Sequence, residues 1–250
     1  MSAMMRALLV CLLLAMSQIS LAEDGTRRFY GYAYDLDSDR YIYTEVHEQV
    51  WKEGRWASGT IRYYAPDNTL WGVKKLDFSA DPYIPLYEYS LPAQGYAEGI
   101  TAIDTKVTLT KTSDGKTKTE QVDKKDPITG DSGFHNFLLA HFQPLIDRQT
   151  VAFTFIAAGN LDSYKFRARR IDDARFEGKP AARFKVEANS LLRLVAPDLE
   201  VSYDPDTQRL LEYRGPSNVI NPDTGKVFDA RIAYYSEPPA DAPTTLPPLQ

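Results

Sequence analysis

Two titratable side chains, Glu45 and His47, stand two residues apart in a segment whose polar and apolar residues alternate. In a β-strand successive side chains point to opposite faces, so both would share one face with Tyr43. Histidine titrates near neutral pH, and a carboxylate beside an imidazole could bind a ligand or move a proton if this face lined a cavity. The alternative is a face of amphipathic side chains that meets water, and the sequence leaves both interpretations open.

Three further charged residues could take part in binding. Glu98 lies in the segment Tyr-Ala-Glu-Gly, and Arg167 and Arg169 alternate along another expected strand. Two guanidinium groups on one side of a strand could hold a carboxylate or a phosphate, or they could form cross-strand ion pairs with Glu45 and Glu98. The candidate ligand-binding residues are therefore Tyr43, Glu45, His47, Glu98, Arg167 and Arg169, and no catalytic residue is nominated.

The remaining chemistry-bearing residues do not form a known motif. His135 and His141 are six residues apart on an expected helix, about 240° around its axis, whereas a helical metal pair is spaced i, i+4. The acidic triplet at 35, 37 and 39 is typical of a turn. The chain has no Gly-x-Ser-x-Gly sequence and no glycine-rich phosphate loop. We expect no metal site and no cofactor.

The N-terminus has the three parts of a cleaved secretory signal. Arg6 is followed by the apolar run 7–16 and by Ser20-Leu21-Ala22, with small residues three and one before the cut. As a helix the run would be about 15 Å long, roughly half of a ~30 Å hydrocarbon core. We therefore predict a signal peptide over 1–22 and a periplasmic or secreted mature protein. Cys11 is the single cysteine of the chain and is lost with the signal.

The charge of the chain limits its partners. Its net charge is −5, and removal of Arg6 makes it −6, which disfavours nucleic acid or an anionic membrane as a partner. No second long apolar run follows, so we expect no transmembrane segment. We also expect the protein to be a monomer. A lipid or lipoprotein ligand stays possible.

Period-two alternation, interrupted by Gly, Asn, Asp and Pro, determines the expected architecture. One amphipathic helix is expected over 134–145, capped by Asp131 or Ser132, with Pro144 ending or kinking it. Segment 81–92 reads as a loop or an irregular edge, and 191–195 as a short helix or strand. The expected strands cover 28–36, 41–52, 56–64, 70–78, 96–103, 106–112, 117–122, 151–156, 163–171, 174–176, 182–187, 199–203, 209–213 and 227–235.

These elements predict a mainly β fold. Short loops favour a long antiparallel meander, and so long a sheet must curl into a strongly curved sheet, a half-barrel or a barrel, covered or plugged by one or two short helices. We expect a single domain over 23–236. The segment 237–250 is rich in proline, and we expect it to be a disordered tail.

Several motifs resemble a family of uncharacterised secreted bacterial proteins. They are Gly133-Phe134, Tyr43-Thr44-Glu45-Val46-His47, Gly95-Tyr96-Ala97-Glu98-Gly99, Leu191-Leu192-Arg193-Leu194 and Tyr213-Arg214-Gly215-Pro216-Ser217-Asn218. This resemblance implies no assigned activity. The architecture is also similar to periplasmic lipoprotein-carrier half-barrels, which bind acyl chains between a curved sheet and its helices; this second likeness concerns the fold alone.

Three functions remain open from the sequence. The first is a non-enzymatic periplasmic carrier or binding protein for a hydrophobic or amphiphilic ligand. The second is a structural or assembly partner in the cell envelope, acting through the Lys/Thr-rich hairpin at 106–125 and the proline-rich tail. The third is an enzyme on a cell-envelope substrate that uses Glu45, His47 and Glu98.

Overall fold

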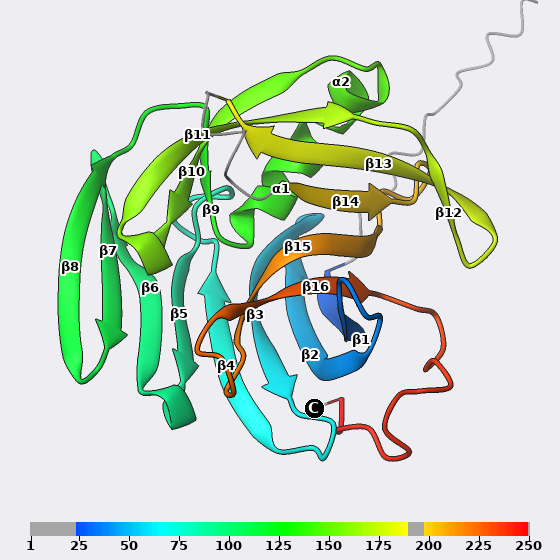
Figure 1. Cartoon of the computed structure of the whole chain (residues 1–250). Coiled ribbons are helices and arrows are strands. Elements are labelled where there is room, and N and C mark those ends of the chain that lie inside the picture. The colour runs from blue at the N-terminus through cyan, green and yellow to red at the C-terminus, as the bar shows by residue number, and fades with distance from the viewer. Residues whose placement is uncertain (1–23, 190–197, 250) are drawn as a thin grey trace, which may run out of the picture.

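A computed structural model describes residues 24–189 and 198–249, and most of them belong to one curved antiparallel sheet (Figure 1). The signal peptide expected over 1–22 and the element expected over 191–195 lie outside the described residues. The strands are β1 (Gly25–Asp35), β2 (Tyr41–Lys52), β3 (Arg55–Tyr64), β4 (Leu70–Asp77), β5 (Leu86–Leu91), β6 (Tyr96–Ile103), β7 (Lys106–Ser113), β8 (Lys116–Asp123), β9 (Ile128–Gly130), β10 (Val151–Ala157), β11 (Asp162–Arg170), β12 (Ala174–Phe176), β13 (Lys179–Ala188), β14 (Leu199–Tyr203), β15 (Leu210–Ile220) and β16 (Val227–Ala233).

The sheet order is β8-β7-β6-β5-β4-β3-β2-β1-β16-β15-β14-β13-β11-β10-β9, with β12 paired beside β13. The chain runs outward from β1 to β8, crosses to β9, and returns strand by strand until β16 pairs with β1. β9 pairs with β10 in parallel, and the other pairs are antiparallel. The predicted fold class, a long antiparallel meander that curves strongly, is confirmed.

The two ends of the sheet approach each other without a hydrogen-bonded ladder between them in the described residues. The short helical turn η2 (Ala158–Asn160) contacts β6 and β7, and β8 contacts β11. Another such turn, η1 (Pro92–Gln94), links β5 to β6. The sheet is therefore curved but not closed.

One predicted loop is wrong. Segment 81–92 contains β5, in which Tyr87, Tyr89 and Leu91 alternate as buried residues. The three prolines that suggested a loop stand outside the strand, at positions 82, 85 and 92, where they remove no hydrogen bond of the ladder. The short strand β9 was also not predicted.

The predicted helix is present as two short helices, α1 (Gly133–Ala140) and α2 (Phe142–Ile146). The curve of the sheet encloses α1 (Figure 1). Phe137, Leu138, Phe142 and Leu145 are buried in a cluster with side chains of β10, β11, β13 and β14. The helix is interrupted at His141, which separates α1 from α2. Pro144 falls in the first turn of α2, where its missing N–H is tolerated. None of the described helices is long and apolar enough to cross a membrane.

A side-chain cap was expected at the start of this helix, and it is not made. Instead the Asp131 carboxylate accepts a bond from Lys74 Nζ at 2.5 Å. Lys74 is on β4 and has no exposed surface, and its ammonium lies over the rings of Tyr87 and Tyr89. This buried ion pair joins the sheet to the beginning of α1.

The C-terminal segment also differs from expectation. Residues 237–249, expected to be disordered, lie against β1, where Tyr30 and Tyr34 donate hydrogen bonds to Pro247 and Asp241. The composition of the segment is typical of disorder, but the tyrosines of β1 supply donors that such a segment otherwise lacks.

Loss of one partner of the buried ion pair should destabilise the fold strongly. Lys74→Met leaves the Asp131 carboxylate buried without its cation, and we expect the free energy of unfolding to fall by about 3–5 kcal/mol in urea titrations. Adding Asp131→Asn to this variant removes the stranded charge and should recover a large part of the loss. Lys75→Met changes the exposed neighbour on the same strand and should alter stability by about 0.5 kcal/mol or less. Equal effects of Lys74→Met and Lys75→Met would contradict this account.

Candidate functional site

Tyr43, Glu45 and His47 point into the curve of the sheet, where each is less than 7% exposed. His47 Nε2 lies 2.7 Å from Glu45 Oε2, and the Tyr234 hydroxyl lies 3.4 Å from the same oxygen. The imidazole stacks on Phe29 with ring centroids 4.6 Å apart. Gly31 makes room for the carboxylate, because a Cβ there would approach Glu45 Oε2 to 2.9 Å. The sequence-predicted carboxylate–imidazole pair is real, but it lies inside the protein.

The space around this pair is filled by side chains. The large residues with less than 2% exposure include Tyr43, Tyr63, Tyr89, Leu91 and Ile100, all of which contribute to the same core. Rings stack edge to face from Tyr43 to Tyr63 and from Tyr63 to Tyr89. Glu45 and His47 therefore present almost no surface to a ligand in this conformation.

Glu98 occupies a different place. Its carboxylate accepts hydrogen bonds from Tyr87 at 2.9 Å and from Tyr96 at 2.5 Å. A Cβ at Gly159 would lie only 2.2 Å from Glu98 Oε2, so the η2 turn rests directly on this carboxylate. Because of this contact, Glu98 marks the point where β6 meets the other end of the sheet. It is not among the hydrogen-bond partners of Glu45 or His47.

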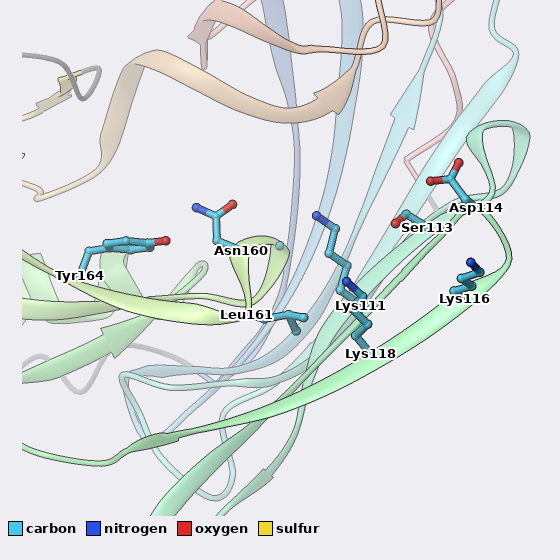
Figure 2. A pocket seen from close by; sticks show the side chains of 9 residues that line it. Lys111, Ser113, Asp114, Lys116, Lys118, Asn160, Leu161 and Tyr164 are labelled. Carbon is cyan, nitrogen blue, oxygen red and sulfur yellow. The ribbon is translucent and has the colours of Figure 1, made fainter.

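A cleft of about 600 Å³ opens at this meeting point (Figure 2). We call it the lysine cleft. One wall is the β7–β8 hairpin, and the other is η2 with the start of β11. Its lining residues are Lys111, Ser113, Asp114, Lys116, Lys118, Gly159, Asn160, Leu161 and Tyr164.

The hairpin places its lysines by simple geometry. Asp114 and Gly115 have φ values of 53° and 70°, which suit a tight two-residue turn. The resulting register pairs Lys111 with Lys118 and Ser113 with Lys116 on one face. Like charges directly opposite each other repel. Within the described residues, Lys111, Lys116 and Lys118 form no ion pair with a carboxylate, although Lys111 Nζ lies 5.8 Å from the Tyr96 ring centroid.

The opposite wall brings polar and apolar groups. Leu161 has a left-handed φ of 56° at the end of η2, and its amide bonds back to Ala158. Figure 2 shows Leu161 and Asn160 beside Lys111 and Lys118, with Tyr164 farther along β11. The cleft thus offers three cations, one amide and a small apolar surface, against the single carboxylate of Asp114. This set suits an anionic ligand.

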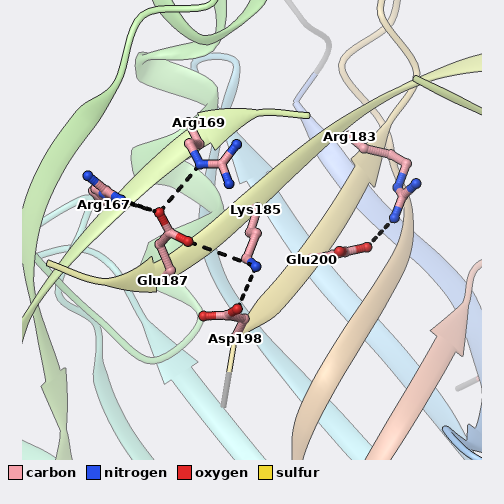
Figure 3. Close-up of polar contacts among 7 residues, drawn as sticks. All are labelled: Arg167, Arg169, Arg183, Lys185, Glu187, Asp198 and Glu200. Atoms are coloured by element: carbon pink, nitrogen blue, oxygen red, sulfur yellow. Dashed lines mark hydrogen bonds and ion pairs between the residues drawn. The ribbon is translucent and has the colours of Figure 1, made fainter. Parts of the chain in front are cut away.

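Arg167 and Arg169 lie on the outer face of the sheet (Figure 3). Arg167 Nη2 is 2.5 Å from Glu187 Oε1, and Arg169 Nε is 3.4 Å from the same oxygen. Burial would raise the pKa of Glu187, but the hydrogen bonds and charges of the two arginines outweigh it and lower the pKa. The cross-strand pairing is real, but the expected partners Glu45 and Glu98 are wrong, because Arg167 faces Glu187 in the register of β11 and β13.

The charged network continues over neighbouring strands. Lys185 lies 2.5 Å from Asp198 and 3.9 Å from Glu187, and Arg183 pairs with Glu200. These charges largely satisfy one another, so the outer face offers few free groups for a ligand.

The six sequence-predicted residues therefore fall in three places. Tyr43, Glu45 and His47 are together in the core, Glu98 lies against Gly159 of the η2 turn, and Arg167 and Arg169 are in the outer network. Sequence reasoning identified the hairpin as lysine-rich but did not nominate its lysines. The Asp-Gly turn and strand alternation could have placed Lys111 opposite Lys118.

Comparison with known proteins gives a limited result. No family model matches the chain, and no curated protein matches it. A crystal structure of a β-barrel-like protein of the domain of unknown function DUF1849, from Brucella abortus, matches with a TM-score of 0.42 and 8% sequence identity. The match covers 84% of this chain and 95% of that chain. The function must be argued from the residues themselves.

Stability should decline in mild acid because of His135. Its ring stacks on Tyr203, and its Nδ1 lies 3.0 Å from the Tyr203 hydroxyl. Burial, assisted by the charge of nearby His47, lowers the pKa of His135 from 6.5 to about 4. Between pH 6.5 and 4, His135 therefore binds a proton in the unfolded chain but not in the folded chain. This contribution to stability is fully present above pH 6.5 and is lost as pH falls towards 4.

The test is a comparison of urea unfolding at several pH values. One histidine gives a slope of at most about 1.4 kcal/mol per pH unit in this window. We expect His135→Gln to flatten the pH dependence between 6.5 and 4, whereas His141→Gln, a replacement at the break between α1 and α2, serves as the matched control. A His135→Gln variant that keeps the full wild-type slope would show that other groups cause it.

Proposed function

We propose that the mature chain is an exported, non-enzymatic binding protein for an anionic amphiphile, which it holds at the lysine cleft. The observation that carries the proposal is the face-to-face placement of Lys111 and Lys118, with Lys116 next to them, none of which is paired with a carboxylate within the described chain. An anionic group between these ammonium groups would relieve their repulsion. A phosphate or a carboxylate has that chemistry.

The position of the cleft supports a ligand with two kinds of surface. Asn160 supplies an amide that can donate or accept hydrogen bonds, and Leu161 and Tyr164 supply apolar contact. A charged headgroup with a short apolar portion matches this combination. A simple carrier that encloses a whole acyl chain fits less well, because the space within the sheet is occupied by tyrosines, leucines and the α1 helix.

An enzymatic role has weaker support. Glu45 and His47 are hydrogen bonded to each other and buried, and Glu98 is engaged by two tyrosines. Acid–base catalysis needs groups within hydrogen-bond reach of a substrate, directly or through one water molecule. Neither Glu45 nor His47 lines the lysine cleft, so a ligand held there does not reach the buried pair. The proposed function is therefore binding without catalysis.

The test uses the mature full-length chain and two soluble short-chain phospholipids of equal acyl length. One has the anionic phosphatidylglycerol headgroup, and the other has zwitterionic phosphatidylcholine. We expect calorimetric titration to show tighter binding of the anionic lipid, with affinity falling as salt rises because screening shortens the Debye length from about 30 Å at 0.01 M to about 8 Å at 0.15 M. Inorganic phosphate serves as a third probe, which separates headgroup recognition from recognition of the whole amphiphile.

Charge-removing variants locate the site. Lys116→Gln with Lys118→Gln should weaken binding of the anionic lipid about tenfold, equivalent to about 1.4 kcal/mol for two exposed charges. Lys106→Gln with Lys125→Gln removes the same charge from the far part of the same hairpin region and should leave affinity within about twofold. Equal binding of the two lipids, or equal loss in the two double variants, would refute the lysine cleft as the site.

A further inference from the structure

A row of tyrosines runs along the outer face of β1. Tyr30, Tyr32 and Tyr34 alternate with Gly31 and Ala33, which face the core, so the three rings share the opposite face. Tyr30 and Tyr32 have ring centroids 6.0 Å apart, and Tyr235 continues the row at 6.2 Å from Tyr32. We call these four residues the tyrosine row. Tyr32 and Tyr34 are 1% and 3% exposed although they belong to none of the three buried hydrophobic clusters.

The C-terminal segment occupies this face. Tyr30 donates a hydrogen bond to the Pro247 carbonyl at 2.7 Å, and Tyr34 donates to Asp241 Oδ1 at 3.0 Å. Asp241 lies within a turn in which the Ala242 amide donates to the Pro239 carbonyl. On the neighbouring β3–β4 turn, Asn68 Nδ2 bonds to the Thr245 carbonyl at 2.8 Å. Three hydrogen bonds thus hold a segment in which five of the thirteen residues from 238 to 250 are proline.

The chemistry of this contact is that of proline-rich peptide recognition. Proline-rich segments have little conformational entropy to lose, and their carbonyls are free because they form no internal hydrogen bonds. Grooves lined by aromatic rings recognise them by packing against proline and donating to those carbonyls. Tyr30 supplies the donor to such a carbonyl, and Pro247 is buried in the folded chain. Tyr34 adds a preference for an acidic residue six positions before that proline.

We propose that the tyrosine row is a recognition site for proline-rich segments, occupied in the isolated chain by its own residues 237–249 and available to the proline-rich segment of a partner protein when that segment is displaced. The best partner segment carries an Asp or Glu six residues before a proline. This inference is independent of the proposed lipid-binding function, since the tyrosine row and the lysine cleft share no residue.

The resident segment sets the concentration at which a partner competes. It is tethered directly after β16, and short tethers produce effective concentrations of about a millimolar. A partner segment with the same contacts must reach that range to exchange. A variant that weakens the contacts of residues 237–249 should lower the partner concentration needed for exchange, provided that the partner does not bind through the altered tyrosine.

A single label can report the exchange in the intact mature chain. Because that chain is expected to carry no cysteine, Leu249→Cys provides one site for a fluorophore on an exposed residue at the end of the segment. We expect high anisotropy while the segment is docked. A synthetic peptide of residues 237–250 should lower the anisotropy in a saturable way at about millimolar concentration. The same peptide with its five prolines changed to alanine should act at concentrations at least about tenfold higher.

Hydroxyl-deletion variants test the contacts themselves. Tyr30→Phe with Tyr34→Phe retains both rings but removes both donors, and it should lower the anisotropy before any peptide is added. Tyr83→Phe removes a hydroxyl from a ring that packs on Phe137 instead, and it should leave the anisotropy unchanged. Far-UV circular dichroism confirms that each variant keeps its sheet.

Three results would overturn the proposal. They are an anisotropy that does not respond to the peptide at several times the expected concentration, equal displacement by the alanine peptide, and equal anisotropy in the double tyrosine variant and Tyr83→Phe. Lipid binding by the same samples reports separately on the lysine cleft, so failure of one proposal is distinguishable from failure of the other.

Discussion

The buried ion pair between Lys74 and Asp131 constrains the rest of the structure. Burying the Lys74 ammonium without a partner would cost several kcal/mol of desolvation free energy. The segment before α1, which carries Asp131, must therefore lie directly over β4. That requirement brings α1 inside the curve of the sheet, where Phe137 and Leu138 pack against the returning strands. A sheet that could have enclosed a cavity is therefore filled by its own helix and by the tyrosines that surround the lysine.

Because its interior is filled, the protein offers a ligand only its surface. Some polar groups of the interior are paired, as Glu45 is with His47. The hydroxyls of Tyr43 and Tyr63 and the Nδ1 of His47 have no hydrogen-bond partner within the described residues, but all three side chains are buried and present almost no surface to a ligand. Three lysines without an ion pair in the described part of the chain, Lys111, Lys116 and Lys118, lie where the two ends of the sheet meet without a ladder.

Local sequence patterns predicted the elements well, and long-range contacts poorly. The bounds of β2 follow from alternation alone, and the Asp114-Gly115 turn follows from the φ values that tight turns require. Alternation also grouped Tyr43, Glu45 and His47, but it could not say that their face is the interior. The partner of Arg167 depends on the register between β11 and β13, and the lysine cleft depends on η2 resting on Glu98. Neither has a local signal. Composition misled at the C-terminus, because the tyrosines that hold the proline-rich segment lie about 200 residues earlier.

The energetics of the two surfaces suit reversible contacts. Repulsion between Lys111 and Lys118 is tolerable because both side chains are on an exposed hairpin, where water screens it. For the same reason an anion between them gains only the modest energy of exposed ion pairs, about 0.2–1 kcal/mol each. The tyrosine row holds its segment by neutral hydrogen bonds of about 1 kcal/mol net and by ring packing. Neither set of contacts is strong enough to hold a ligand for long. If both proposals hold, the anionic ligand and the proline-rich segment bind weakly enough to exchange.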